Sequence, residues 1–264
     1  MAHPARRIAT RGRFADRCRT AAESACRLHT LVREMLPTLD CRNDPQWLIK
    51  ACNLMRTLGM VAVEGVLDEE FVREARAAMY RAQAAVLQEV GKERLDRSDE
   101  LGVIRLPLKG VFQTRFHMDF PRVLNGYLMS INLMFAIDEY RVDNGATQFL
   151  LGSHQQRTPP DVEALRSTAI QGVCPAGSMI LFDSTLYHAA GTNVSSSDRV
   201  AVNHGFVPPW VKQHIDIVRM LGDDFVQSLP RRTQSLLGWD ARVPANLDEY
   251  YKPPAERLYK GGQG

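Results

Sequence analysis

The sequence predicts a β-barrel or β-sandwich core packed by helices from both ends of the chain. Helical periodicity dominates the first hundred residues, and from about residue 101 short β-rich runs separated by turn residues replace it. Many short strands without long helices between them are typical of antiparallel barrels and sandwiches. Helical patterns return after residue 210. We therefore expect one domain over residues 1–264, with a mainly helical part at 1–100, a β core at 101–210 and a helical part at 211–264.

The composition is that of a globular protein and excludes several classes of partner. Of the 264 residues, 45% are hydrophobic and 24% are charged, which suffices for a sizeable core and excludes a wholly disordered chain. The apolar runs are far shorter than the roughly 20 residues that span a bilayer, so we expect no membrane partner. A net charge of +3 is too small to indicate nucleic acid. The arginine-rich first thirty residues fit a targeting peptide, a basic arm or a helical surface, and we interpret them as a solvated helical surface.

The cysteines predict a reducing compartment. There are five, an odd number, at irregular spacing and without a CxxC motif. Disulfide frameworks are rare in the cytosol, where thiols stay reduced. We therefore expect free thiols and a cytoplasmic location. The sequence leaves the oligomeric state open.

The first hundred residues contain clear helix boundaries. Asp44, followed by Pro45, suits the start of a helix, and Gly59 suits its end. Residues 60–63 form a short apolar run that predicts a strand. Asp68 then precedes a longer stretch with apolar residues at helical spacing, which predicts a second capped helix.

The predicted strands of the core and the helices that follow it are short. The strands are expected at 103–106, 126–137, 147–151, 178–182 and 199–207, and the helices at 211–221 and 224–229. Turn-forming residues lie between the strands, such as Asp143-Asn144-Gly145.

Three residues suggest a metal centre. His117 and Asp119 are two apart, so in a strand both side chains point to the same side and can bind one cation. Alone this pattern is weak, because surface His/Asp pairs are common. His188, after a later strand, would complete the two-histidine, one-carboxylate set typical of non-haem Fe(II) oxygenases. Arg199, at the start of the next predicted strand, requires an anionic partner if it faces the core, and a carboxylate would satisfy it.

Four segments, in order, resemble the phytanoyl-CoA dioxygenase family of Fe(II)/2-oxoglutarate oxygenases. They include the H-x-D segment around His117, the Asn144-Gly145-Ala146-Thr147 motif, and the stretch from Gly177 to Arg199. The fourth is the strand and helix start at 59–68, and together they cover about residues 58–207. One departure is Leu151, where the family usually has proline; it does not affect the metal-binding positions.

The resemblance implies a fold, a cofactor set and an activity. The fold is a double-stranded β-helix, also called a jelly roll, which is cupin-like. His117, Asp119 and His188 would bind Fe(II), and Arg199 would hold the distal carboxylate of the co-substrate 2-oxoglutarate. Oxygen is the second co-substrate, and succinate and CO2 are products. Because Asp119 keeps the carboxylate that related halogenases lack, hydroxylation or oxidative ring closure of an unactivated C–H bond is favoured over halogenation.

Three further residues are candidates for co-substrate or substrate contacts. Asn132 shares a strand face with Ser130, and this polar pair on an apolar strand either faces solvent or lines a polar cavity. The resemblance to the family implies that this face of the strand looks toward the co-substrate. Thr147 and Gln113 are weaker candidates of the same kind.

The substrate is expected to be a small molecule. Residues 236–259 are similar to a bacterial subgroup of the family that includes orthosomycin-type oxygenases, so we expect a natural-product intermediate such as a glycoside in oligosaccharide antibiotic biosynthesis. Three alternatives remain open from the sequence: a cupin-like metal-dependent isomerase or hydrolase, a catalytically inactive binding module of the same fold, and an interaction protein with coincidental motifs.

Overall fold

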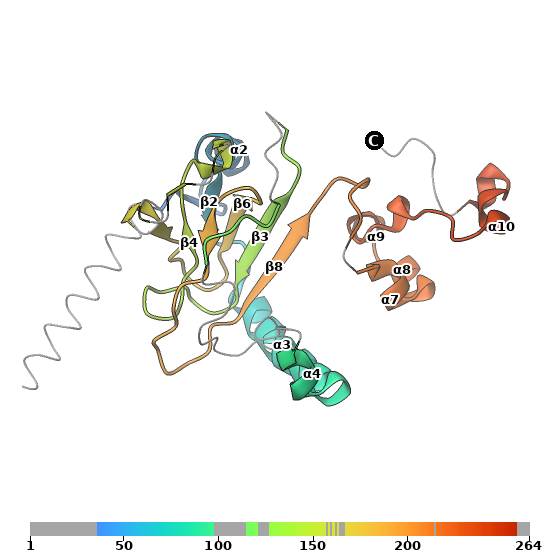
Figure 1. The fold of residues 1–264 in the computed structure, drawn as a ribbon, viewed down its shortest axis with the longest axis horizontal. Coiled ribbons are helices and arrows are strands. Elements are labelled where there is room, and N and C mark those ends of the chain that lie inside the picture. The colour runs from blue at the N-terminus through green and yellow to red at the C-terminus, as the bar shows by residue number, and fades with distance from the viewer. Residues whose placement is uncertain are drawn as a thin grey trace, which may run out of the picture. The chain divides into compact units, whose positions relative to one another are not determined.

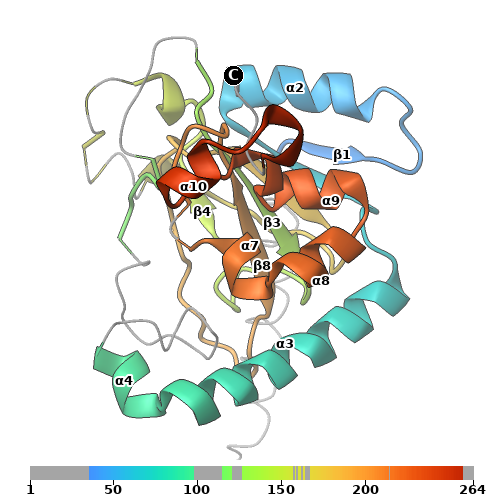
Figure 2. The same cartoon turned by 90° about the vertical axis from the view of Figure 1, so that its right-hand side faces the viewer.

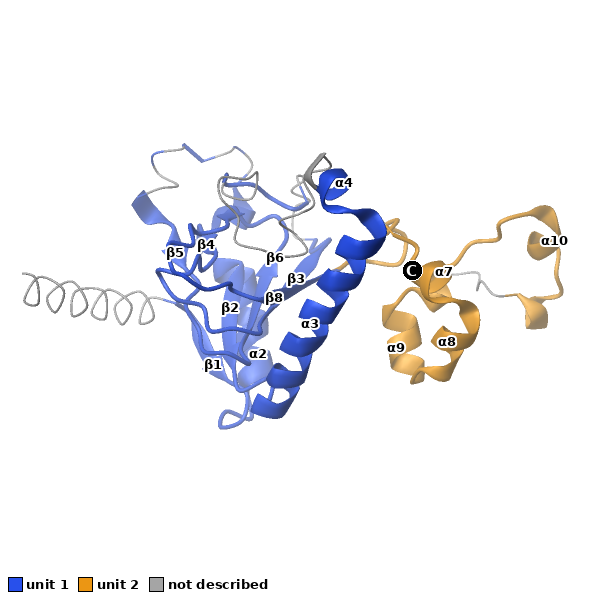
Figure 3. Ribbon diagram, turned by 90° about the horizontal axis from the view of Figure 1, so that it is seen from below, with its two compact units in different colours: residues 1–205 blue, residues 206–264 orange. Residues whose placement is uncertain are grey.

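The computed structural model describes residues 36–97, 115–120, 127–156, 158, 160–161, 163, 167–213 and 215–257. The chain divides into two compact units, residues 1–205 and 206–264, coloured blue and orange in Figure 3. The expectation of one domain over 1–264 stays a prediction. The arginine-rich first thirty residues, the predicted strand at 103–106 and the candidate Gln113 lie outside the described residues.

The larger sheet of the first unit has five strands in the order β1-β2-β6-β3-β8 (Figure 1). Their bounds are Thr38–Asp40 for β1, Met60–Glu64 for β2, Met179–Asp183 for β6, Ile131–Ala136 for β3 and Ala201–Phe206 for β8. β1 runs parallel to β2, while β2 and β3 are both antiparallel to β6. The sheet is therefore mixed, because β1 adds a parallel edge to the antiparallel arrangement that the sequence predicts.

The smaller sheet has three strands in the order β5-β4-β7. They are Ile170–Gln171 for β5, Gln148–Phe149 for β4 and His188–Ala189 for β7. Phe149 of this sheet meets Phe182 of the larger sheet edge to face, with ring centroids 5.2 Å apart. The two sheets thus share one buried core. The prediction of a sheet-dominated core with flanking helices is confirmed, and the jelly-roll winding stays a prediction.

Helix α2 (Trp47–Leu58) covers one face of the larger sheet. Ala51 and Met55 are buried against the outward side chains of β2, Val61 and Val63. The helix begins after Gln46, two residues later than predicted. Gly59 ends it with φ 83°, as predicted, and a side chain there would be strained.

Helix α3 (Glu69–Val90) is the long helix crossing the lower part of Figure 2, and the short α4 (Lys92–Arg97) follows it. Asp68 caps α3 as predicted, accepting a hydrogen bond from the backbone N–H of Phe71 at 2.7 Å. Arg76 pairs with Asp138 at 2.8 Å, which ties the helix to the loop after β3.

The second unit consists of short helices. They are α7 (Ile217–Leu221), α8 (Asp223–Ser228), α9 (Arg231–Leu236) and α10 (Leu247–Tyr250), with 3-10 turns η3 (Trp239–Ala241) and η4 (Pro254–Glu256). A further turn, η2 (Ser153–Gln155), belongs to the first unit. None of the helices in the described part of the chain is long and apolar enough to cross a membrane.

Candidate metal centre

The structure brings His117, Asp119 and His188 together. One ligand atom from each lies within 4.8 Å of the other two. His117 and His188 face each other across an antiparallel bridge and exchange two backbone hydrogen bonds, at 2.9 and 3.0 Å. Their rings are consequently close, with centroids 4.4 Å apart. Asp119 Oδ1 lies 3.4 Å from the Nε2 atom of His117 and 3.6 Å from that of His188.

Backbone carbonyls orient both imidazole rings. Nδ1 of His117 is 2.8 Å from the carbonyl oxygen of Arg115, and Nδ1 of His188 is 2.9 Å from that of Leu186. A carbonyl only accepts, so we assign the proton of each ring to Nδ1, which leaves the lone pair of Nε2 for the shared space. Two imidazole nitrogens and one carboxylate oxygen are a donor set that fits Fe(II).

Side chains of the H-x-D segment alternate between two sides, and those on one side anchor the segment to the protein. His117 and Asp119 converge with His188, whereas Phe116 and Met118 pack into a small apolar cluster with Leu150. The third member of the metal set, His188, is buried against the rings of two core phenylalanines: its ring lies 4.9 Å from that of Phe182 and 6.2 Å from that of Phe149.

The electrostatics of the three groups favour a neutral histidine beside an ionised carboxylate. Burial lowers the pKa of His188, which keeps its imidazole neutral and able to bind a metal. The Asp119 carboxylate, 3.4 Å from Nε2 of His117, raises the pKa of His117 because it stabilises a second proton on that ring. Burial acts to raise the pKa of Asp119, but the adjacent imidazoles of His117 and His188 outweigh this and hold it below the ordinary value.

Asn132 lies beside the metal set rather than in solvent. It is 4% exposed, and its side-chain amide donates to Asp119 Oδ2 at 2.8 Å and to Ser184 Oγ at 2.9 Å. The described structure therefore gives it a contact with a predicted ligand residue, and the predicted contact with a co-substrate or substrate stays a prediction. Thr147 is buried, and its hydroxyl donates to the sulfur of Met134 at 3.5 Å.

Arg199 stacks on a tyrosine that the sequence analysis missed. Its guanidinium carbon lies 4.4 Å from the ring centroid of Tyr140. Tyr140 is fully buried, its hydroxyl has no hydrogen-bond partner among the described residues, and burial raises its pKa to about 12. The ring belongs to the same core cluster as Phe149 and Phe182, so this core links Arg199 to His188. Tyr140 lies in no recognisable motif, which is why its position alone indicates nothing.

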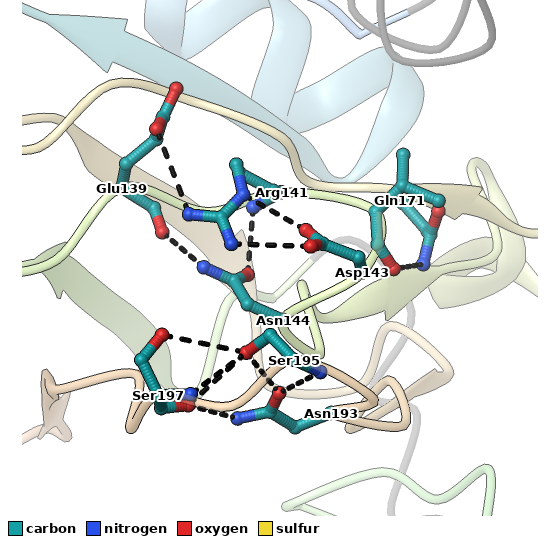
Figure 4. A network of polar contacts seen from close by, with 9 residues as sticks. Glu139, Arg141, Asp143, Asn144, Gln171, Asn193, Ser195 and Ser197 are labelled. Carbon is teal, nitrogen blue, oxygen red and sulfur yellow. Dashed lines mark hydrogen bonds and ion pairs between the residues drawn. The ribbon is translucent and has the colours of Figure 1, made fainter. Parts of the chain in front are cut away.

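The Asn144 motif holds the loop between β3 and β4 in shape (Figure 4). The side chain of Asn144 donates to the carbonyl of Glu139 at 2.7 Å and accepts from the backbone N–H of Arg141 at 2.8 Å. Arg141 also pairs with Asp143 at 2.9 Å. The backbone of Asn144 forms a bridge with Asn193, in the loop that leads to Arg199.

The loop that contains Gly145 and the loop that contains Gly191 approach too closely for side chains at these two positions. A Cβ atom on Gly191 would lie 2.4 Å from the carbonyl oxygen of Ala146, and one on Gly145 would lie 2.9 Å from that of Gly191. Gly145 also has φ 84°, a conformation that favours glycine. The loop bearing the motif therefore packs backbone to backbone against the loop that precedes Arg199.

Two histidines and one carboxylate on a two-sheet β core are the features of a mononuclear non-haem iron enzyme. The model of the phytanoyl-CoA dioxygenase (PhyH) family matches residues 107–201. The uncharacterized protein Rv1501 of Mycobacterium tuberculosis is 45% identical over 255 residues, covering 80% of this chain and 93% of that protein. The dioxygenase cdmA of Talaromyces verruculosus is 30% identical over 122 residues, covering 44% of this chain and 39% of that protein.

The chain belongs to the phytanoyl-CoA dioxygenase family, so it is an oxidoreductase that depends on Fe(II), 2-oxoglutarate and O2. Among solved structures, it aligns with the epimerase SnoN at 18% identity and a TM-score of 0.46, over 62% of this chain and 84% of that one. AviO1 from Streptomyces viridochromogenes aligns with the same identity and TM-score, over 62% of this chain and 96% of that one.

Proposed function

We propose that His117, Asp119 and His188 bind Fe(II), and that the enzyme oxidises an unactivated C–H bond of a small organic substrate. The observation that carries the proposal is the convergence of the three ligand atoms within 4.8 Å, with both Nε2 lone pairs turned to one space. Such a set leaves three adjacent positions on the metal for the co-substrate and O2. One atom of O2 is used in converting 2-oxoglutarate to succinate and CO2, and the other oxidises the substrate.

Arg199 and Tyr140 are proposed to hold the distal carboxylate of 2-oxoglutarate. The guanidinium offers a planar pair of donors that matches a carboxylate, and stacking on the Tyr140 ring restricts where it points. The buried hydroxyl of Tyr140 is a hydrogen-bond donor still lacking a partner among the described residues. A carboxylate bound beside Arg199 would offer it one. Contacts from Thr147 and Gln113 stay predictions.

The substrate and outcome are the finer part of this proposal. The carboxylate of Asp119 supports hydroxylation or oxidative ring closure rather than halogenation. The similarity of residues 236–259 to natural-product oxygenases supports a natural-product intermediate, with glycosides of oligosaccharide antibiotics as the first compounds to test. The cytoplasmic location stays a prediction from the cysteine pattern.

The experiment is anaerobic reconstitution with Fe(II) and 2-oxoglutarate. The measured signal is the weak visible charge-transfer band of the chelated complex. The wild-type protein should show the band, and His188→Ala should abolish it. His204→Ala is the matched control, because His204 is exposed on β8 and should leave the band unchanged. Folded, metal-bound protein without a band would overturn the proposal and favour a cupin-like isomerase, a hydrolase or an inactive binding module.

A further inference from the structure

The two carboxylate oxygens of Asp119 have different partners. Oδ1 faces the metal side, at 3.4 Å from Nε2 of His117 and 3.6 Å from Nε2 of His188. Oδ2 instead accepts a hydrogen bond from the side-chain amide of Asn132 at 2.8 Å. One oxygen is therefore placed to bind a metal, while the other is occupied by a protein donor.

The orientation of the Asn132 amide is determined by three neighbours. Its nitrogen donates to Asp119 and also to Ser184 Oγ at 2.9 Å, and its oxygen accepts from Asn203 Nδ2 at 3.3 Å. The hydroxyl of Ser184 donates in turn to Ser130 Oγ at 2.7 Å, so a lone pair of Ser184 faces the amide. A flipped amide would set its oxygen against the carboxylate and lose these bonds.

The larger sheet supplies this network. Asn132 is on β3, Asn203 is on the neighbouring β8, and Ser130 and Ser184 adjoin the paired ends of β3 and β6. Asn132, Ser130 and Ser184 are all buried. This buried part of the network is rigid, because breaking a bond within it leaves an unsatisfied group in a low-dielectric interior. The two outer members, Asp119 and Asn203, are exposed. The sheet therefore gives Asp119, which lies outside a regular strand, a fixed support.

We propose that Asn132 is a positioning residue that restricts Asp119 to binding iron through Oδ1 alone. This inference rests on the metal site proposed above. Carboxylates bind metals through one or both oxygens. Six-coordinate iron held by two imidazoles and one oxygen keeps three positions open, and binding through both oxygens would fill one of them. The co-substrate and O2 require all three, so the hydrogen bond to Oδ2 preserves the capacity of the site for both.

The test separates iron binding from co-substrate binding in Asn132→Leu, which removes the amide at similar side-chain size. Fe(II) affinity should stay near that of the wild type, while 2-oxoglutarate affinity, titrated anaerobically through the charge-transfer band, should fall about 10-fold or more, the scale of one hydrogen bond to a charged group. Asn203→Ala, at an exposed position, should shift 2-oxoglutarate affinity in the same direction by less and guards against misfolding of the first variant.

The matched control is Ser178→Ala, because Ser178 is buried, its hydroxyl has no hydrogen-bond partner among the described residues, and it lies outside the network. It should bind iron and 2-oxoglutarate as the wild type does. The inference is overturned if Asn132→Leu loses Fe(II) and 2-oxoglutarate affinity in parallel, or neither. A wild type without the band would instead contradict the proposed function, so the two failures are distinguishable.

Discussion

Removing the guanidinium of Arg199 tests the co-substrate site directly. A bidentate pair with a carboxylate contains two charge-assisted hydrogen bonds, each worth about 1.5–3 kcal/mol. Arg199 is only half-buried, so solvent screens the pair, and we take about 3 kcal/mol in total. Arg199→Ala should then weaken 2-oxoglutarate binding by on the order of 100-fold. Arg199→Lys keeps the charge but loses the planar pair of donors. Its 2-oxoglutarate affinity should lie between that of the wild type and that of Arg199→Ala.

Tyr140 provides a sharper version of the same test, because its ring and hydroxyl are separable. Tyr140→Phe keeps the surface on which Arg199 stacks and removes a buried hydroxyl that has no partner among the described residues. An unsatisfied buried hydroxyl destabilises the folded state by about 1–3 kcal/mol. The variant should therefore unfold at higher denaturant concentration without ligand, yet bind 2-oxoglutarate more weakly than the wild type.

The assay is the anaerobic titration of iron-loaded protein with 2-oxoglutarate, with urea unfolding measured on the same preparations. Arg73→Ala is the control for Arg199→Ala, because Arg73 is exposed on α3 and pairs there with Glu70. An unchanged 2-oxoglutarate affinity in Arg199→Ala would refute the assignment of the carboxylate site. A Tyr140→Phe variant that is more stable but binds 2-oxoglutarate normally would refute the role of the hydroxyl alone.

Three other perturbations have defined outcomes. His188→Ala should lose Fe(II) binding measured by metal titration, and retention of wild-type affinity would exclude His188 as a ligand. Gly191→Ala places a Cβ 2.4 Å from the carbonyl oxygen of Ala146, so it should destabilise the fold by about 1–3 kcal/mol in urea unfolding. An unchanged urea midpoint would contradict the close approach of the loops that contain Gly145 and Gly191. Asp68→Ala removes the cap on Phe71 N–H and should lower stability by about 1 kcal/mol, whereas Asp68→Asn should lower it less.

Local signals account for the parts of the fold that the sequence predicts well. Strand β2 and the ends of helices α2 and α3 follow from a short apolar run, a left-handed glycine and a capping aspartate, each of which acts within a few residues. The convergence of His117, Asp119 and His188 was also predictable, because histidine and carboxylate side chains carry their ligand chemistry wherever they stand in the chain.

Strands defined by tertiary pairing were missed. β1, β5 and β7 contain two or three residues each and form only because a partner strand is present. His204 alternates with Val202 and Phe206 along β8, a pattern that predicts a histidine in the core, but it is exposed. It does lie on the same face as Phe135, with ring centroids 5.9 Å apart, and alternation alone does not tell whether another element covers that face.

The residues that contact the three predicted metal ligands were the hardest to predict, because their types are ordinary and their partners are distant. Asn132 bonds to residues 13, 52 and 71 positions away, from three separate segments. Alternation limits its side chain to one face of β3, leaving solvent or a polar cavity as the choices, and only the fold decides between them. Asn144 presents the converse case: the motif is recognisable in the sequence, yet its observed contacts are with loop backbone. The described structure connects it to the predicted co-substrate site only through the backbone bridge to Asn193, in the loop that precedes Arg199.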